Sequence, residues 1–512
     1  MSLLISRIAL SVCLLTVAAL TACTVGPDFQ RPVAALPDRW HVDEKHSIAA
    51  PSTKTSSRIV DSTLDPRWWE AFHDAELSSL IDRVAASSLD VKAATARLMQ
   101  AGAARRVTGS DTAPSVNGAA SYQHARSSQN GLLDISGLDG KHDYNLWRPG
   151  FDASWELDLW GRVRREIESA DANIEASADL RRDVLLATLA ETADDYMELR
   201  GVQAQLHIVE QNLQIARHSL ELTRIRFADG ISTRLDVAEA SAQVSTIEAQ
   251  QPSLESRRVR LVNALSFLMG AAPRSLESEL HDSAPIPSMS SRVPAGLPSE
   301  LAERRPDIRV AEAHLHAATA NIGVAIGDFY PRVTLSGEFN LQAMHFGDLD
   351  TWGSRMFGVG PALNMPLFDG GRLKGQLALR NAQQEEAAIA FQRTVLNAWH
   401  EVDDAMSDYN ASQIHHDLLA EAVAQNQIAL DNAQRQYGAG ATDFLNVLAV
   451  QKDLLGTQQA LASSSVDLAV SLVNLYKALG GGWQGAFPAS PGGANAGKMT
   501  GMSNIHGEHD HA

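Results

Sequence analysis

The sequence predicts a mainly α-helical protein with a few membrane-spanning β-strands, built by internal duplication. Three observations lead to this fold class. Residues 150–270 reappear at 360–480 with a constant shift of 210 positions. Segments of alternating apolar and polar residues occur in each half, and very long segments without proline follow them. A register held over such a distance indicates that each half repeats one architectural unit.

Individual motifs show the duplication. Leu157–Arg162 corresponds to Leu367–Arg372 at the shift of 210, whereas the segments before the strands match at a shift of 217. The loop between the first two strands, at about 124–144, is therefore expected to be seven residues longer than the loop at about 344–352. Because length is least constrained in exposed loops, we expect both loops to face outward.

Residues 1–22 have the properties of a secretory signal peptide. Arg7 precedes an apolar run over residues 8–20 that is too short to span a bilayer, and Leu-Thr-Ala-Cys follows it. This tetrapeptide resembles the bacterial lipobox, in which cleavage leaves a lipid-modified cysteine. Cys23 is therefore the predicted site of a covalent acyl lipid, and Thr24 after it favours sorting to the outer membrane. The alternative is an ordinary signal peptide with an incidental cysteine.

The composition argues against several function classes. A formal net charge of −18 argues against nucleic-acid binding. The chain contains no Gly-x4-Gly-Lys-Ser/Thr motif for a nucleotide phosphate. No spacing of nucleophile and base, or of metal ligands, indicates an enzyme. We therefore expect neither catalysis nor a cofactor, apart from the lipid on Cys23.

Two strands are predicted in each half. They cover about 114–123 and 145–158 in the first half, and about 331–342 and 354–367 in the second. Over 145–158 the apolar residues occupy one face and the polar residues the other. Strands of about ten residues with this pattern are typical of transmembrane barrels. A half-buried sheet of a soluble protein is the alternative.

Four long helices complete the two halves, at about 161–227, 233–269, 371–437 and 443–479. The first contains a seven-residue repeat that is typical of a coiled-coil seam, formed by Leu199, Leu206, Leu213, Leu220 and Phe227. At 1.5 Å per residue this helix would be roughly 100 Å long. Turns with glycine are expected where each pair of helices reverses direction.

Four strands cannot close a membrane barrel by themselves. Open sheet edges are not tolerated in lipid, and the smallest membrane barrels have about eight strands. Several copies of the chain must therefore share one barrel. Three copies would supply about twelve strands, although closure alone would also allow a dimer or a tetramer.

Seven segments along the mature chain occur in an order that is typical of one family: Cys23–Phe29, Trp68–Trp69, Ser154–Asp158, Arg304–Ile308, Phe329–Pro331, Phe368–Arg372 and Leu475–Trp483. With these motifs the chain resembles the TolC-like outer-membrane factors of tripartite efflux pumps, in the lipoprotein branch often called NodT-type. The resemblance implies a homotrimer whose outer-membrane barrel continues as a long periplasmic helical barrel. It also implies an equatorial belt from about 40–88, 270–304 and 480–490.

The resemblance further implies a function and partners. The protein would be a passive exit channel for drugs or other small solutes in the outer membrane. A periplasmic adaptor (membrane-fusion protein) would meet the helix tips, and an inner-membrane transporter of the resistance-nodulation-division type would supply the energy. The alternatives are an exit duct for type I protein secretion and a coiled-coil envelope protein without a pore.

The domains follow from these expectations. The signal peptide is followed by the first repeat at 23–270, the second repeat at 271–483 and a tail at 484–512. The tail is rich in Gly, Ala, Pro and Ser, which is typical of disorder. It ends with Met499, Met502, His506, His509 and His511, whose sulfur and imidazole groups suit copper or zinc. The alternative is a solvated tail with incidental histidines.

The two helix turns are the candidate functional site. We expect the following residues to shape the tips that an adaptor meets: Gly230, Ser232, Thr233, Gly438, Gly440 and Thr442. In a trimer each polar side chain after a turn becomes a ring of three, and carboxylate rings favour cations. The candidates for such a constriction are Asp236, Glu239, Asp443 and Asn446. Helix capping is the alternative, because Thr233–Asp236 has the pattern of a capping box.

Overall fold

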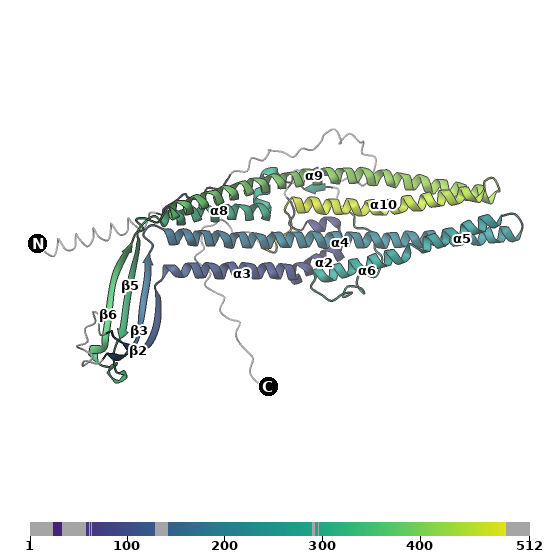
Figure 1. The fold of residues 1–512 in the computed structure, drawn as a ribbon. Coiled ribbons are helices and arrows are strands. Elements are labelled where there is room, and N and C mark those ends of the chain that lie inside the picture. The colour runs from purple at the N-terminus through teal and green to yellow at the C-terminus, as the bar shows by residue number, and fades with distance from the viewer. Residues whose placement is uncertain are drawn as a thin grey trace.

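The structure is a computed structural model that describes residues 24–32, 58–60, 62, 64–128, 142–288, 292–294 and 296–487. The molecule is elongated, with a small sheet at one end and long helices that run away from it (Figure 1). The fold class predicted from the sequence, mainly helical with a few strands, is confirmed. Cys23 and the tail histidines His506, His509 and His511 lie outside the described residues.

The sheet has four antiparallel strands in the order β2-β3-β5-β6. Their bounds are Ser115–Arg126, Asp143–Leu157, Arg332–Leu341 and Arg355–Asn364, in chain order. The sequence-predicted range for β6 extended to residue 367, but the strand ends at Asn364. Pro366 follows shortly and has no backbone N–H for a ladder. β2 and β6 are the two edges of this sheet.

The register of the sheet separates an apolar face from a polar face. Phe151 pairs with Phe339, and Phe339 pairs with Phe357, so the three rings form one row across the sheet. All three are exposed in the single chain, Phe357 at 77%. The next row along contains Asp152 opposite Glu338. Since side chains alternate between the faces of a strand, these carboxylates belong to the other face.

Two helices of equal length dominate the molecule. α4 covers Arg162–Ala228 and α9 covers Arg372–Gly438, with 67 residues each. Both ends of α9 are shifted by 210 residues from those of α4, so the duplication holds to the residue over this length. No helix in the described part of the chain combines the length and the hydropathy needed to cross a membrane.

Both long helices begin in the same way. Gly161 and Gly371 precede them in left-handed backbone conformations, with φ of 83° and 92°, which glycine adopts without a steric penalty. At α4 the Asp158 carboxylate accepts hydrogen bonds from the backbone N–H groups of the first turn. At α9 Asp369 does the same through Leu373 N at 2.8 Å. The sharp change of direction between strand and helix is therefore encoded locally.

The returning helices differ between the repeats. α10 runs without interruption over Phe444–Ala478. The sequence predicted one helix over 233–269, but the structure divides it into α5, Arg234–Glu248, and α6, Gln251–Leu268. Pro252 lies in the first turn of α6 and cannot donate to the preceding turn. The residue 210 positions later is Ala462, a strong helix former.

Shorter elements lie beside the long helices and at the ends of the strands. The α-helices are α2, Ala75–Ser87; α3, Leu89–Gly109; α7, Leu301–Arg304; and α8, Pro306–Gly327. β1, Arg58–Val60, pairs in parallel with β4, Arg292–Pro294. The 3-10 helices are η2, Trp68–Phe72; η3, Ser110–Thr112; η5, Pro298–Glu300; η6, Phe346–Asp348; and η7, Trp352–Ser354.

The main apolar core lies where α2, α4 and the end of α10 meet. Trp68 is fully buried there, stacks on Tyr476 at 5.4 Å between ring centroids, and donates its indole N–H to Gly481 O at 3.1 Å. Leu80 of α2 and Leu189 of α4 pack into the same cluster. This core joins the short elements to the long helices at mid-height.

The segment 24–32 is bound where the sheet meets the helices. Val25 N donates to Trp160 O at 3.0 Å, directly before α4. The buried Arg165 side chain of α4 donates to Val25 O and to the Asp28 carboxylate, at 3.1 and 2.6 Å. Gly26 crosses α8 so closely that a Cβ there would lie 2.5 Å from the Cα of Gly323. Val25, two residues after Cys23, is therefore fixed beside the base of the strands.

Candidate functional site

The first tip is the turn between α4 and α5, at the end of the molecule opposite the sheet (Figure 1). Gly230 has a φ of 75°, and the following backbone N–H groups of Ile231 and Ser232 fold back onto Arg226 O. The chain therefore reverses direction within a few residues, between the end of α4 and the start of α5. Ser232 and Thr233 then begin α5, with Thr233 as the N-cap.

The second tip, between α9 and α10, has the same geometry. Gly440 has a φ of 75°, and Ala441 N donates to Gln436 O at 2.9 Å. Gly438 is the last residue of α9, so of the two predicted glycines here only Gly440 occupies the left-handed region. Thr442 precedes Asp443, which is the N-cap of α10.

The carboxylates at the tips cap the returning helices. Asp236 and Thr233 form a reciprocal capping box, and the Ser232 hydroxyl also donates to Asp236 at 2.7 Å. The backbone N–H of Thr233 and the Ser232 hydroxyl lower the pKa of Asp236. Asp443 accepts a hydrogen bond from Asn446 N at 3.0 Å. Capping thus engages both aspartates.

The four candidate constriction residues differ in exposure. Asp443 and Asn446 are exposed in the single chain, whereas Asp236 and Glu239 are partly buried. Glu239 Oε2 is buried without a hydrogen-bond partner among the described residues. The second tip therefore offers the more accessible polar groups.

A contact between the two tips was not identified from the sequence. The Arg226 guanidinium of α4 lies over the Tyr437 ring of α9 at 4.4 Å and donates to Tyr437 O at 3.1 Å. Tyr437 also packs against Phe444 at the start of α10. A cation–π contact of this kind contributes about 0.5–1 kcal/mol at an exposed site. The signal available in the sequence was a basic and an aromatic residue near the ends of the two long helices.

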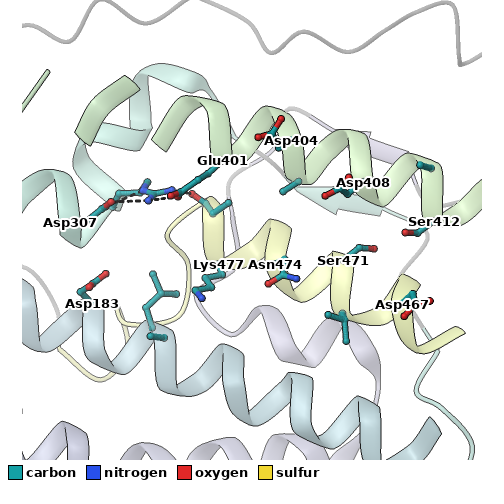
Figure 2. Close-up of a pocket in the computed structure, with 17 residues that line it drawn as sticks. Asp183, Asp307, Glu401, Asp404, Asp408, Ser412, Asp467, Ser471, Asn474 and Lys477 are labelled. Carbon is teal, nitrogen blue, oxygen red and sulfur yellow. Dashed lines mark hydrogen bonds and ion pairs between the residues drawn. The ribbon is translucent and has the colours of Figure 1, made fainter. Parts of the chain in front are cut away.

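A groove of about 670 Å³ lies at mid-height, where α4, α8, α9 and α10 converge (Figure 2). Its charged lining is mostly acidic and consists of Asp183, Asp307, Glu401, Asp404, Asp408, Asp467, Arg305 and Lys477. Asp467 and Lys477 line it from α10, whereas Leu472 and Tyr476 of the same helix point into the apolar core. The groove and the packed core therefore lie on different sides of α10.

Arg305 joins three of the groove helices. Its guanidinium donates to the Asp307 carboxylate at 3.0 and 2.8 Å, to Ala478 O at 3.0 Å, and pairs with Glu401 at 2.6 Å. Only 8% of the residue is exposed. Figure 2 shows Asp307 and Glu401 at one end of the groove, with dashed contacts between them, and Lys477 between Asp183 and Asn474. The cation holds the start of α8, the side of α9 and the end of α10 together.

Burial disfavours the charged state of several acids in this region. Burial, and then the charge of Asp307, raise the pKa of Asp183. On the next turns of α4, burial raises the pKa values of Asp194 and Asp195 to about 7. Asp194 and Asp195 would therefore change charge near neutral pH. Among the described residues, no three His, Cys, Asp or Glu side chains are placed to hold a metal ion.

The groove was missed because its residues come from distant parts of the sequence. The one local signal is the spacing of Glu401, Asp404 and Asp408, which places three carboxylates along one face of α9. Charged residues on long helices usually form solvated faces, so this spacing alone does not predict a groove.

A known protein family matches the chain once in each of its two repeats. The family model described as outer membrane efflux protein matches twice, at residues 80–271 and 297–481, and so covers more than half of the chain. The two matches correspond to the two repeats of the structure.

Individual relatives cover nearly all of the chain. It is 30% identical over 478 residues to the outer membrane protein OprJ of Pseudomonas aeruginosa, covering 92% of this chain and 95% of OprJ. It is 34% identical over 430 residues to the pyoverdine export outer membrane protein OpmQ of Pseudomonas putida, covering 83% and 90%.

The three-dimensional fold also matches that of a solved outer-membrane channel. The solved structure of the outer-membrane channel OprN superposes with a TM-score of 0.81 at 32% identity, covering 90% of this chain and 100% of OprN. Sequence, duplication and three-dimensional fold thus lead to one conclusion. The chain belongs to the outer membrane efflux protein family, and it has the TolC-like fold of outer-membrane efflux channels.

Proposed function

We propose that the protein is a passive exit channel in which three copies share one outer-membrane barrel and one periplasmic helical barrel. The observation that carries the proposal is the four-stranded sheet with two edges, β2 and β6. An open edge is not tolerated in lipid, so β6 of one copy must pair with β2 of the next. Three such sheets give about twelve strands, within the range of membrane barrels.

The two faces of the sheet support a membrane location. The row of Phe151, Phe339 and Phe357 would face lipid, whereas Asp152 and Glu338 would face the interior. This is the alternation of apolar exterior and polar lumen found in outer-membrane barrels. The family relationship places the protein in the outer membrane, and the long helices then extend into the periplasm.

The N-terminal segment supports a lipid anchor on Cys23. Val25, two residues after Cys23, is hydrogen-bonded to Trp160 at the junction of sheet and helices. An acyl chain on Cys23 would then enter the membrane beside the barrel. Two or more acyl chains are needed for stable anchoring, which diacylglycerol with a further acyl group supplies.

We expect mass spectrometry of the purified protein to find an N-terminal peptide that begins at Cys23 and carries these acyl groups. Because the barrel also holds the protein in the membrane, Cys23→Ser is expected to remove the lipid without releasing the protein. An unmodified cysteine in the wild-type peptide would contradict the anchor. The readout is independent of channel activity.

The partners are proposed from the geometry of the tips and from the family. A periplasmic adaptor would contact the turns around Gly230 and Gly440, which have the same backbone conformation and are exposed. An inner-membrane transporter of the resistance-nodulation-division type would then deliver drugs or other small solutes. The exit channel itself would supply no energy.

The test is the conductance of the detergent-purified protein in a planar bilayer, together with its oligomeric state. We expect a trimer with cation-selective steps, because the exposed Asp443 side chains of three copies would form a carboxylate ring at the second tip. Asp443→Asn should reduce the cation preference several-fold, roughly as a ring of three charges is removed.

Asp282→Asn is the matched control, because Asp282 is fully exposed far from the tips. It should leave selectivity unchanged. A soluble monomer without conductance would contradict the shared barrel. Equal selectivity in both variants would contradict a carboxylate ring at the second tip.

A further inference from the structure

Three consecutive residues of α10 each bind a different helix. The Thr457 hydroxyl accepts from Asn426 Nδ2 of α9 at 3.0 Å. Gln458 Oε1 accepts from Asn212 Nδ2 of α4 at 2.9 Å. Gln459 Nε2 donates to Gln250 Oε1, in the break between α5 and α6, at 2.6 Å. We call these six residues the polar belt: Asn212, Gln250, Asn426, Thr457, Gln458 and Gln459.

The polar belt adjoins otherwise apolar packing. Two clusters pack at neighbouring positions, one formed by Val209, Leu213, Ala216, Ile247 and Leu455, the other by Leu430, Ala433, Val447 and Leu454. The belt lies roughly 20 Å from the start of α10, at 1.5 Å per residue. Polar residues inside a coiled coil cost stability, and they are kept where they fix a register or permit a change.

Three of the helices are weakened near this belt. The break between α5 and α6, at Ala249 and Gln250, removes regular helix hydrogen bonds directly before Pro252. In α10, Gly456 precedes Thr457, and a glycine inside a helix lowers its stability by about 1 kcal/mol relative to alanine. In α4, Asn212 Nδ2 also donates to Ile208 O, a carbonyl of its own helix. Such local side-chain bonds compete with the backbone ladder.

The belt also has spare hydrogen-bonding capacity. Asn212 Oδ1 and Gln451 Nε2, two turns from Gln458 on α10, are buried without partners among the described residues. An unsatisfied acceptor and an unsatisfied donor cost free energy in this arrangement. A polar layer of this kind is therefore suited to two alternative packings.

We infer that the polar belt is a hinge, about which the tip segments of both helical hairpins swing when the channel opens. The inference rests on the proposed exit-channel function, because only a channel with a gated tip needs this motion. The belt holds the four helices in register, and the weak points of α4, α5–α6 and α10 allow bending there. The segments between the belt and the tips then move as units, held together by their own apolar cluster of Leu220, Ala240 and Phe444.

Two substitutions should stiffen the hinge without unfolding the protein. Pro252→Ala restores the residue type found at the equivalent Ala462, and Gly456→Ala removes the helix-weakening glycine. Nothing lies within 4 Å of the position that a Cβ would take at Gly456. Gly102→Ala in α3 is the matched control, since its Cβ position is equally open and it lies far from the belt.

Hydrogen–deuterium exchange of the full-length protein measures the weakness of the break directly. We expect the amides of 249–256 to exchange about tenfold faster than those of 459–466, because local opening is easier where helix hydrogen bonds are missing. Pro252→Ala should remove most of this difference, and Gly102→Ala should leave it unchanged. Equal protection of the two segments in the wild-type protein would overturn the hinge.

Spin labels at Ile231→Cys and Arg260→Cys report motion across the belt, with labelled chains diluted among unlabelled ones. Both positions are exposed. We expect a broad distance distribution that narrows in Pro252→Ala and Gly456→Ala but not in Gly102→Ala. The fraction of time spent in conducting states should fall several-fold in the same two variants.

The two measurements separate the inference from the proposed function. A narrowed distribution with unchanged conductance would overturn the hinge as a gating device while leaving the channel intact. Unchanged distributions in both stiffened variants would overturn the hinge itself. A wild-type protein that never conducts, even with an adaptor present, would contradict the channel function, and the distance distributions would still decide whether the belt bends.

Discussion

Replacing Arg305 with methionine should destabilise the protein by about 1–3 kcal/mol, because it removes charge-assisted hydrogen bonds of a buried guanidinium whose carboxylate partners are partly exposed. The change leaves Asp307 and Glu401 without their cation, and Ala478 O without its donor. The Asp183 carboxylate nearby also loses a positive charge that lowers its pKa. Thermal unfolding of the full-length protein measures the loss as a lower midpoint.

The stability that Arg305→Met loses should increase as the pH rises. The pKa of Asp183 is higher in the folded protein than in the unfolded chain. Its contribution to the free energy of unfolding is therefore greatest at low pH, and it falls as the pH rises between the unfolded and the folded pKa. Without Arg305, whose positive charge lowers the pKa of Asp183, that pKa rises further. The difference in the free energy of unfolding between wild type and Arg305→Met should therefore grow from about pH 4 towards neutral pH.

Arg257→Met is the control for this prediction. Arg257 pairs with Glu198 at 3.1 Å, but both side chains are largely exposed, so its loss should cost below about 1 kcal/mol. Equal losses in the two variants, or an Arg305→Met deficit that does not change with pH, would show that the groove cation does not hold the helix ends together.

Gly201→Val should prevent close packing of α4 against α10. A Cβ at Gly201 would lie 2.1 Å from Val466 Cγ2, which is far too close for two non-bonded carbon atoms. Even Gly201→Ala should cost about 1–3 kcal/mol, the usual penalty for overpacking a core. Valine adds two further methyl groups at the same point and is expected to reduce the yield of folded protein severely.

A second substitution tests the cause. Val466→Ala removes the methyl groups that clash, so Gly201→Ala with Val466→Ala should regain most of the stability lost in Gly201→Ala alone. The coupling energy from this double-mutant cycle is the quantity to measure. Additive losses would mean that Gly201 is required for a reason other than its contact with Val466.

Much of the fold followed from patterns that repeat along the chain. Strands between lipid and lumen must alternate, so the period of two over 145–158 was sufficient to predict β3. The equal lengths of α4 and α9 followed from the constant shift of 210. The turn chemistry of Thr233 and Asp236 was also readable, because a capping box involves only four consecutive residues.

The features that escaped prediction depend on contacts between distant residues or on a choice between two local structures. Pro252 is compatible with a kink in one helix or with the first turn of a new helix, and the sequence does not distinguish them. The acidic groove combines residues from four helices, so neither Asp183 nor Asp467 is notable in its own neighbourhood. The contact of Arg226 with Tyr437 requires that both long helices end at the same level.

The equal helices α4 and α9 restrict how this protein can change its reach across the periplasm. At 1.5 Å per residue, each spans about 100 Å. Deleting a single residue from one of them would rotate everything beyond it by about 100° and bring the two tips to different depths. An insertion preserves the coiled-coil seam only if it adds seven residues, or about 10.5 Å. The same insertion must then be made in the outgoing and the returning helices of both hairpins. The length of the helical part can therefore change only in large steps, and the helices of both hairpins must change together.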